Sequence, residues 1–258
     1  MKQFLLPYNT QVGACLSLGG ADLHYLSHVR RMKFGDTLIC RTPDGAEVTC
    51  LVEKIDQAVM TIKVMAVNII SVSAGKNPIA LHLIQGIPKG KKLDMIISQA
   101  VQLGVSSILP LQCRNSVAEL DERWDRKKTR FQGIIKEAIQ QSGSLGMTEL
   151  LDPCSLGQFL SQHPLPKQGL GLFLHEQLLE QSSLHGYLEG NPTTISLVVG
   201  PEGGLAPEEV KLLLEAGFKP IYLGKQILRT ETAAIVGLGA LRIIVQERPY
   251  WSLKDKDN

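Results

Sequence analysis

The sequence lacks several features that would identify a class of protein at once. It contains no apolar run of the roughly 20 residues that a membrane-spanning helix needs, and its N-terminus does not resemble a signal peptide. Its five cysteines are odd in number, and no two of them have CxxC spacing. This usage is typical of reduced thiols, and we therefore expect a soluble cytoplasmic protein with no membrane partner.

The motifs of several common enzyme classes are also missing. The segment Gly86–Lys92 resembles a phosphate-binding P-loop, but it has three residues between its glycines instead of four, and Lys92 replaces the magnesium-binding Ser or Thr. The glycines near residue 200 do not form GxGxxG, and no GxSxG nucleophile elbow occurs. His24 and His28 lie four residues apart, but no Glu follows His24 as in the metalloprotease motif. We therefore expect no metal, no nicotinamide cofactor and no P-loop nucleotide.

Charge is unevenly distributed along the chain. The formal net charge is only +2, but residues 86–136 carry ten Lys or Arg against five Asp or Glu, a local surplus of +5. Such a surplus can meet the phosphates of a nucleic acid, and it is also typical of a solvated helix face.

The first 72 residues differ in pattern from the rest. Short β-prone runs at 37–41, 46–52 and 59–67, with an Asp-Gly turn after the first, predict a small antiparallel barrel or sandwich. A helix is expected at 22–32 with Asp22 as its N-cap. Residues 71–78 have the composition of a linker.

Beyond Pro78, strand patterns alternate with helix patterns. Strands are expected at 79–84, 105–109, 171–174, 195–199 and 220–223, and helices at 93–103, 124–140, 156–162, 207–216 and from 230 to about 246. This alternation predicts an α/β domain in which helices cover a mostly parallel sheet. The last helix is apolar nearly all round, which indicates burial, either within one subunit or at a subunit interface. Gly237 and Gly239 in it favour close packing against another backbone.

Two glycine-bearing loops follow the last two expected strands, at 200–204 and 223–229. Ligands of open α/β sheets bind at the carboxyl ends of the strands, so both loops should line one pocket, where main-chain groups can read an adenine edge. Arg229 lies beside the positive end of the last helix, which is unfavourable unless an anion is near. Thr230 and Glu231 are suited to capping that helix as well as to a functional role.

These loops carry the most specific resemblance of the chain. The sequences GPEGGL at 200–205 and LGKQILRTETA at 223–233 resemble the signature of the bacterial 16S ribosomal RNA uridine-N3 methyltransferases, the RsmE family of the SPOUT class. Weaker similarity covers nearly the whole chain and is carried by Asp22–Leu26, Val29, Arg31, Gly35-Asp36, Asp44-Gly45, Gln102–Val105, Pro110, Glu137-Ala138 and Gln141-Ser142.

The resemblance implies a PUA-like, RNA-binding β-barrel at 1–72 and a SPOUT methyltransferase domain with a trefoil knot at 73–258. It implies a homodimer through the C-terminal domain, with the last helix at the interface. It also implies S-adenosylmethionine as cofactor and N3 of one uridine in 16S ribosomal RNA, or the small ribosomal subunit, as substrate. The residues that match the cofactor-binding motifs are Leu174, Gly200, Glu202, Gly203, Leu223, Gly224, Ile227, Leu228 and Arg229.

Three charged residues are candidates for the chemistry. Uridine N3 carries a proton that must leave, and Glu231 or Glu202 can accept it or position the base. Arg229 can steady the charge that develops on the uracil oxygens, or hold a phosphate. Phosphate contacts are expected from basic residues of both domains, namely Arg31, Lys33, Lys89, Lys91, Lys92, Arg114 and Lys136.

The chain departs from the family pattern at Gln99, Gln102 and Ser144, where lysine, glutamate and arginine are common, and these changes affect expected RNA contacts more than the cofactor site. Two alternative functions stay open. One is a SPOUT methyltransferase for another RNA site. The other is an RNA-binding ribosome-assembly factor without catalysis.

Overall fold

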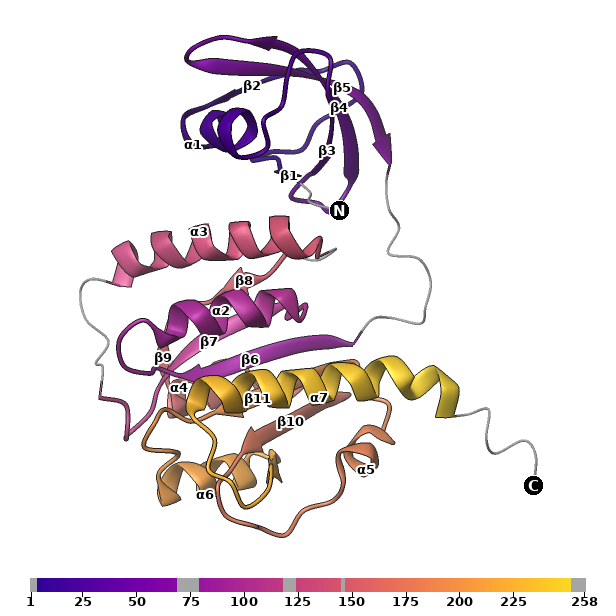
Figure 1. The fold of residues 1–258 in the computed structure, drawn as a ribbon. Helices are drawn as coiled ribbons and strands as arrows, with labels where there is room; N and C mark the ends of the chain where they lie inside the picture. Colours follow the sequence, from indigo (N-terminus) through magenta and orange to yellow (C-terminus); the bar gives the residue numbers. More distant parts are fainter. Residues whose placement is uncertain (1–3, 69–78, 118–123, 145–146, 252–258) are drawn as a thin grey trace. The chain divides into compact units, whose positions relative to one another are not determined.

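The computed structural model describes residues 4–68, 79–117, 124–144 and 147–251 (Figure 1). The chain divides into two compact units, one comprising residues 1–74 and 139–147 and the other residues 75–138 and 148–258. The predicted linker at 71–78 lies entirely outside the described residues. None of the described helices is long and apolar enough to cross a membrane.

The first unit is built on a five-stranded sheet in the order β1-β3-β4-β5-β2. Its strands are β1 (Phe4–Leu5), β2 (Cys15–Gly19), β3 (Thr37–Arg41), β4 (Glu47–Ile55) and β5 (Val59–Asn68). The β1–β3 pair is parallel and the others are antiparallel. Alternate residues of β4 and β5, such as Val48, Cys50 and Ile62, are buried in one core. The three predicted strands are confirmed, and since no described pairing joins β1 to β2, the sheet is a half-barrel.

The helix predicted at 22–32 begins earlier and has a different form. It comprises α1 (Gly20–His24) and a π-helical turn η1 (Tyr25–Val29). Gly19 is the N-cap, without a side-chain cap bond, so the prediction of Asp22 as N-cap was wrong. Gly20 adopts a φ of +56°, which lets the chain turn directly from β2 into the helix and places Asp22 inside the first turn.

The second unit contains a seven-stranded sheet whose main order is β12-β10-β11-β6-β7-β8. Its strands are β6 (Ala80–Gly86), β7 (Ser107–Gln112), β8 (Glu149–Leu150), β9 (Cys154–Ser155), β10 (Gly169–Leu174), β11 (Thr194–Val199) and β12 (Lys219–Ile221). Every pairing in it is parallel, including that of β9 with β7. The predicted parallel sheet is therefore confirmed. The carboxyl ends of β10, β11 and β12 meet at one edge.

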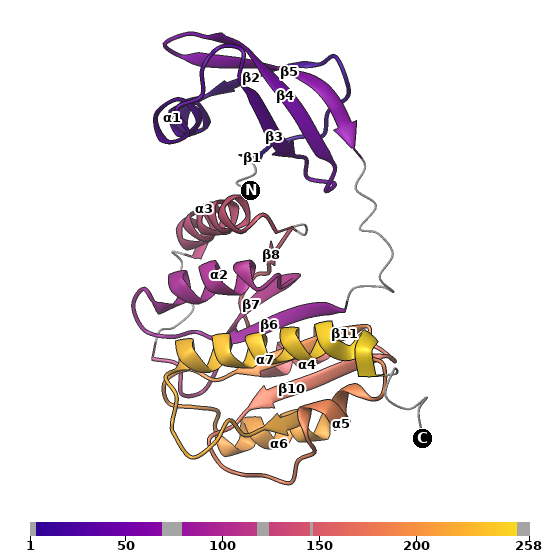
Figure 2. The ribbon, with the colours of Figure 1, turned by 45° about the vertical axis from the view of Figure 1, so that its right-hand side comes forward.

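Helices cover both faces of this sheet. They are α2 (Lys92–Gln102), α3 (Trp124–Ser142), α4 (Leu156–Gln162), α5 (Leu184–Leu188), α6 (Pro207–Glu215) and α7 (Thr230–Trp251). Phe159 of α4 and Leu213 of α6 share a core with Val198 of β11. On the opposite face, α7 lies against β11, where Leu197 approaches Gly237, and α2 lies beside α7 (Figures 1 and 2). The predicted helices are all present, whereas α5 was not predicted.

The composition of the last helix had suggested burial on all sides, but only part of its surface is buried. Ala234, Leu238 and Leu241 are fully buried, whereas Val236 and Ile243 are exposed. A Cβ added at Gly237 would lie 3.1 Å from the side chain of Leu197, so this glycine permits close packing on the sheet. A Cβ at Gly239 would meet nothing within 4 Å. One side of α7 therefore presents apolar side chains that the other described residues leave exposed.

Candidate functional site

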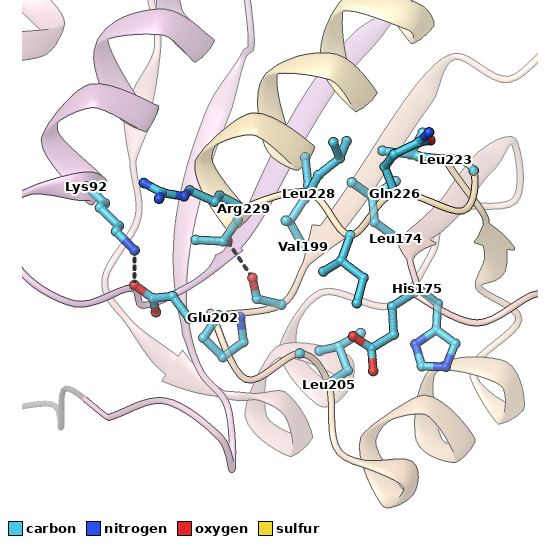
Figure 3. Close-up of a pocket in the computed structure, with 18 residues that line it drawn as sticks. Lys92, Leu174, His175, Val199, Glu202, Leu205, Leu223, Gln226, Leu228 and Arg229 are labelled. Atoms are coloured by element: carbon cyan, nitrogen blue, oxygen red, sulfur yellow. Dashed lines mark hydrogen bonds and ion pairs between the residues drawn. The ribbon is translucent and has the colours of Figure 1, made fainter.

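A pocket of about 380 Å³ lies at the carboxyl ends of β10, β11 and β12 (Figure 3). This volume is in the range of small-molecule sites, and the position follows the rule for ligands of parallel α/β sheets. Three loops and one residue of α2 line it: Lys92, Leu174, His175, Glu176, Val199, Gly200, Pro201, Glu202, Gly204, Leu205, Leu223, Gly224, Gln226, Ile227, Leu228, Arg229, Thr230 and Ala233.

The loop after β11 is shaped by close backbone approaches. A Cβ added at Gly86 would lie only 2.6 Å from the backbone nitrogen of Pro201, so the end of β6 touches this loop directly. Asn115 Nδ2 donates hydrogen bonds to the carbonyls of Gly203 (3.0 Å) and Gly204 (3.3 Å). The loop is therefore fixed from two sides.

The loop after β12 is tied to the first loop through a buried threonine. The Thr230 hydroxyl donates to the carbonyl of Gly200 (2.6 Å) and accepts from Gln85 Nε2 (3.0 Å). Capping of the last helix and a functional role were both open for Thr230, and its hydroxyl joins the start of α7 to Gly200 and Gln85. Gly224 has a φ of +114°, a conformation that side chains rarely allow.

We expect Thr230→Val to loosen both loops. The substitution keeps the shape of the side chain but leaves the Gly200 carbonyl and the Gln85 amide without this partner, and each buried unpaired group costs about 1–3 kcal/mol. The free energy of unfolding, measured by urea denaturation, should fall by that amount. The variant Thr232→Val changes an exposed threonine of the same helix and should leave the free energy of unfolding unchanged. Equal stability of both variants would contradict the assigned role of Thr230.

A third wall of the pocket was only partly predicted. Leu174 was expected there, but His175 and Glu176, the next two residues, also line it. The His175 amide donates to the carbonyl of Ile221 (3.0 Å), which holds the segment after β10 against β12. Burial lowers the pKa of the His175 imidazole, although Glu176 acts in the opposite direction, so the ring is mainly neutral at pH 7. The position directly after a buried strand was the signal that could have found both residues.

Charged side chains gather at the opposite end of the pocket. Lys92 Nζ lies 2.7 Å from Glu202 Oε1 and 3.9 Å from Glu231 Oε2 (Figure 3 shows the shorter contact). Burial acts to raise the pKa of Glu202, but hydrogen bonds from Lys92 and from backbone amides outweigh it and hold the pKa below its usual value. The Arg229 guanidinium has no hydrogen bond or ion pair with any residue that the structure describes, although it stands at the amino end of α7, where the Arg229 carbonyl accepts from the Ala233 amide (2.8 Å).

The structure brings together most of the predicted site residues. Of the cofactor set, only Gly203 is absent from the pocket wall, because it faces Asn115. Glu231 is not one of the pocket-lining residues, but its Oε2 lies 3.9 Å from Nζ of Lys92, which lines the pocket.

The predicted phosphate contacts are more dispersed. Arg31 and Lys33 belong to the first unit and the other five to the second. Lys92 is paired with Glu202, and Arg114 Nη1 lies 3.4 Å from Glu208 Oε1. No cluster of three or more His, Cys, Asp or Glu suited to a metal occurs among the described residues.

Comparison with known proteins identifies the family. A family model described as "RNA methyltransferase domain" matches residues 75–242. The chain belongs to this family. The ribosomal RNA small subunit methyltransferase E of Bacillus subtilis is 33% identical over 232 residues, which cover 87% of this chain and 88% of that protein. The enzyme of the same name from Synechocystis is 29% identical over 241 residues, which cover 91% and 75%.

Solved structures of similar proteins extend the family match to nearly the whole chain. A putative methyltransferase from Legionella pneumophila, in complex with bound cofactor SAM, is 30% identical with a TM-score of 0.82, covering 94% of this chain and 97% of that one. A ribosomal RNA small subunit methyltransferase E from Neisseria gonorrhoeae, bound to S-adenosyl methionine, is 25% identical with a TM-score of 0.83, covering 95% and 98%. The α/β methyltransferase fold is thus shared with both of these proteins.

Proposed function

We propose that this protein is an S-adenosylmethionine-dependent methyltransferase that modifies N3 of a uridine in 16S ribosomal RNA of the small subunit. The observation that carries the proposal is the pocket formed by two glycine-bearing loops at the carboxyl ends of β11 and β12, which flank β10 in the sheet, in a chain similar to proteins crystallised with this cofactor. Such a substrate places the protein in the cytoplasm, where ribosomes are assembled.

The pocket residues suit this cofactor. S-adenosylmethionine supplies a methyl group that its sulfonium has already activated. Main-chain groups near Gly200, Leu223 and Leu228 are available to an adenine edge, and apolar side chains such as Leu174 provide contact surface for the ring. The lining carries two carboxylates, Glu176 and Glu202, and two cations, Lys92 and Arg229. Because Lys92 is paired with Glu202, we expect the Glu176 carboxylate to complement a cationic ligand. The chain's part is to hold donor and acceptor in line, which can supply roughly 7 kcal/mol of barrier lowering.

RNA contacts are proposed for the basic residues of both units. The loop that carries Arg31 and Lys33 also exposes Phe34, whose side chain is 76% accessible. An exposed aromatic ring that follows two cations in the sequence is suited to stacking on an unpaired base. Lys89, Lys91, Arg114 and Lys136 would extend this role to the second unit, whereas the ammonium of Lys92 is occupied by Glu202. Binding should weaken as salt concentration rises.

The finer features of the fold belong to the same proposal. We assign the first 72 residues to a PUA-like RNA-binding domain and residues 73–258 to a SPOUT methyltransferase domain with a trefoil knot. The bond from Thr230 to Gly200, together with the contact of Gly86 with the 200–204 loop, supports a chain that threads closely between its own loops.

We also propose a homodimer through α7. Val236 and Ile243 are exposed, and Gly239 lies between them on the same side of the helix. This apolar stripe is the surface expected to pack against a second copy.

The substitution Gly239→Leu tests the dimer. Because a Cβ added at this position meets nothing within 4 Å and leucine favours helix more than glycine does, the fold should be retained. Sedimentation should show a dimer for the unmodified protein and a monomer for the variant. Gly133→Leu, at an equally open helical position on α3, is the matched control and should stay dimeric. A variant as dimeric as its control would contradict an interface on α7.

The function itself is tested by mass spectrometry of ribosomal RNA from cells with and without the gene. Loss of one 3-methyluridine from 16S ribosomal RNA, restored by adding protein and S-adenosylmethionine to isolated subunits, is the expected result. Unchanged RNA with intact cofactor binding would favour a binding factor without catalysis, and a different missing methyl group would favour another RNA site.

A further inference from the structure

The two carboxylates beside Lys92 differ in the hydrogen bonds that they accept, and this difference separates their roles. Both were candidates to take the proton of uridine N3. Glu202 and Glu231 lie on different segments, the loop after β11 and the first turn of α7, and Lys92 Nζ lies within 4 Å of both. The hydrogen bonds that each one already makes therefore decide which is available to a substrate.

Glu202 is already occupied by donors. Its Oε1 accepts from Lys92 Nζ (2.7 Å) and from the Lys89 amide (3.1 Å), and its Oε2 lies 3.3 Å from the same amide. Hydrogen bonds to the charged form of a carboxylate lower its affinity for a proton. Glu202 is thus built to hold the 200–204 loop to the segment before α2 and is a poor proton acceptor.

Glu231 has an acceptor position left open. Its side chain is only 11% exposed, and its Oε2 is buried without a hydrogen-bond donor among the residues that the structure describes, since Lys92 at 3.9 Å is too far for one. A buried carboxylate oxygen without a donor is unfavourable, and an N–H group of a ligand would relieve it. Its neighbours in sequence, Arg229 and Thr230, both line the pocket.

We propose that Glu231 is the residue that accepts the N3 proton of the target uridine. The inference rests on the proposed function. The N3–H bond breaks with its electron pair kept on nitrogen, and the proton passes to the Glu231 carboxylate. The nitrogen pair forms the bond to the methyl carbon as the carbon–sulfur bond breaks toward sulfur. One cation and one carboxylate anion are thereby replaced by a neutral thioether and a neutral acid, so charge balances without any other reactant.

In this scheme Lys92 is a positioning residue. Its ammonium is closer to Glu202 than to Glu231 by more than 1 Å, so it orients the Glu231 carboxylate electrostatically without filling the acceptor position. The position near two carboxylates also explains why Lys92 is a weaker candidate for RNA phosphate than its neighbours.

The test compares Glu231→Gln with Glu202→Gln on two RNA substrates, one with uridine and one with 5-fluorouridine at the target. Fluorine makes N3–H more acidic, so a lost proton acceptor matters less. For Glu231→Gln, single-turnover methyl transfer to uridine should fall by about 100-fold or more. On the 5-fluorouridine RNA this loss in rate should be at least roughly tenfold smaller. On the uridine RNA the loss should also become smaller as the pH rises. Cofactor affinity by calorimetry should stay within about threefold of the unmodified protein.

Glu202→Gln should behave oppositely, with weaker cofactor binding and the same proportional loss on both RNAs. As a second variant, Glu231→Ala should regain activity when formate is added. A loss for Glu231→Gln that is equal on both RNAs, together with no formate rescue, would overturn the assignment. Failure of the unmodified protein to form 3-methyluridine would instead overturn the proposed function, so the two failures are distinguishable.

Discussion

Replacing Gly86 by alanine is expected to weaken S-adenosylmethionine binding by about 100-fold, or roughly 3 kcal/mol. The added Cβ would stand 2.6 Å from both the nitrogen and Cδ of Pro201 and 2.8 Å from the carbonyl carbon of Gly200. Two of these neighbours are backbone atoms that cannot rotate away, so the 200–204 loop must shift. Overpacking of this kind typically also costs about 1–3 kcal/mol of stability. Calorimetry with the cofactor and urea denaturation measure the two effects.

Gly133→Ala is the matched control for Gly86→Ala. It adds the same methyl group at an exposed position of α3 where nothing lies within 4 Å, and alanine favours helix. Cofactor affinity should be unchanged and stability equal or slightly higher. If Gly86→Ala bound the cofactor as tightly as this control, the close approach of β6 to the loop would have no part in shaping the pocket.

Replacing Arg229 by alanine is expected to lower methyl transfer by about 100-fold or more, because removal of one donor to a developing charge typically costs that much. Arg229 lines the pocket beside the positive end of α7, and its guanidinium has no ion pair or hydrogen bond with the described residues. A guanidinium in that position is favourable only with an anion nearby. Cofactor affinity should change by less than about tenfold, since the partner is expected on the RNA.

Kinetics separate the two roles that remain open for Arg229. A loss in kcat with little change in the KM for RNA would indicate that it steadies charge on the uracil oxygens. A rise in KM with a smaller dependence on salt would indicate a phosphate contact. Arg229→Lys keeps the charge but not the planar donor pair, so it should rescue the phosphate role better than the oxyanion role. Unchanged kcat and KM in Arg229→Ala would remove this residue from the mechanism.

Much of the second unit was predictable because its sequence pattern is regular. The helix at 156–162 was predicted to the residue, and Pro207 at the first position of α6 was correct because proline suits the first turn of a helix. The glycine-bearing loops could be assigned to one pocket because the strands before them are parallel. The helix α5 was missed, since its five residues are too few to give a periodic pattern.

The remaining details depend on contacts between distant segments. Lys92 looked like a surface phosphate ligand, and only the folded chain places it between carboxylates of residues 202 and 231. Thr230 resembled a helix cap, but its partners lie 30 and 145 residues away. The exposed side of α7 could not be separated from its buried side, because apolar residues occupy both. No local pattern contains this information.

The most direct test of the central claim is a crystal structure of the protein with S-adenosylhomocysteine, together with its binding stoichiometry in solution. The account predicts one ligand per chain in the pocket between the 200–204 and 223–229 loops, with its adenine on main-chain groups of the second loop and its amino-acid end near the charged side chains. Density for the ligand elsewhere on the molecule, with this pocket left empty, would contradict it.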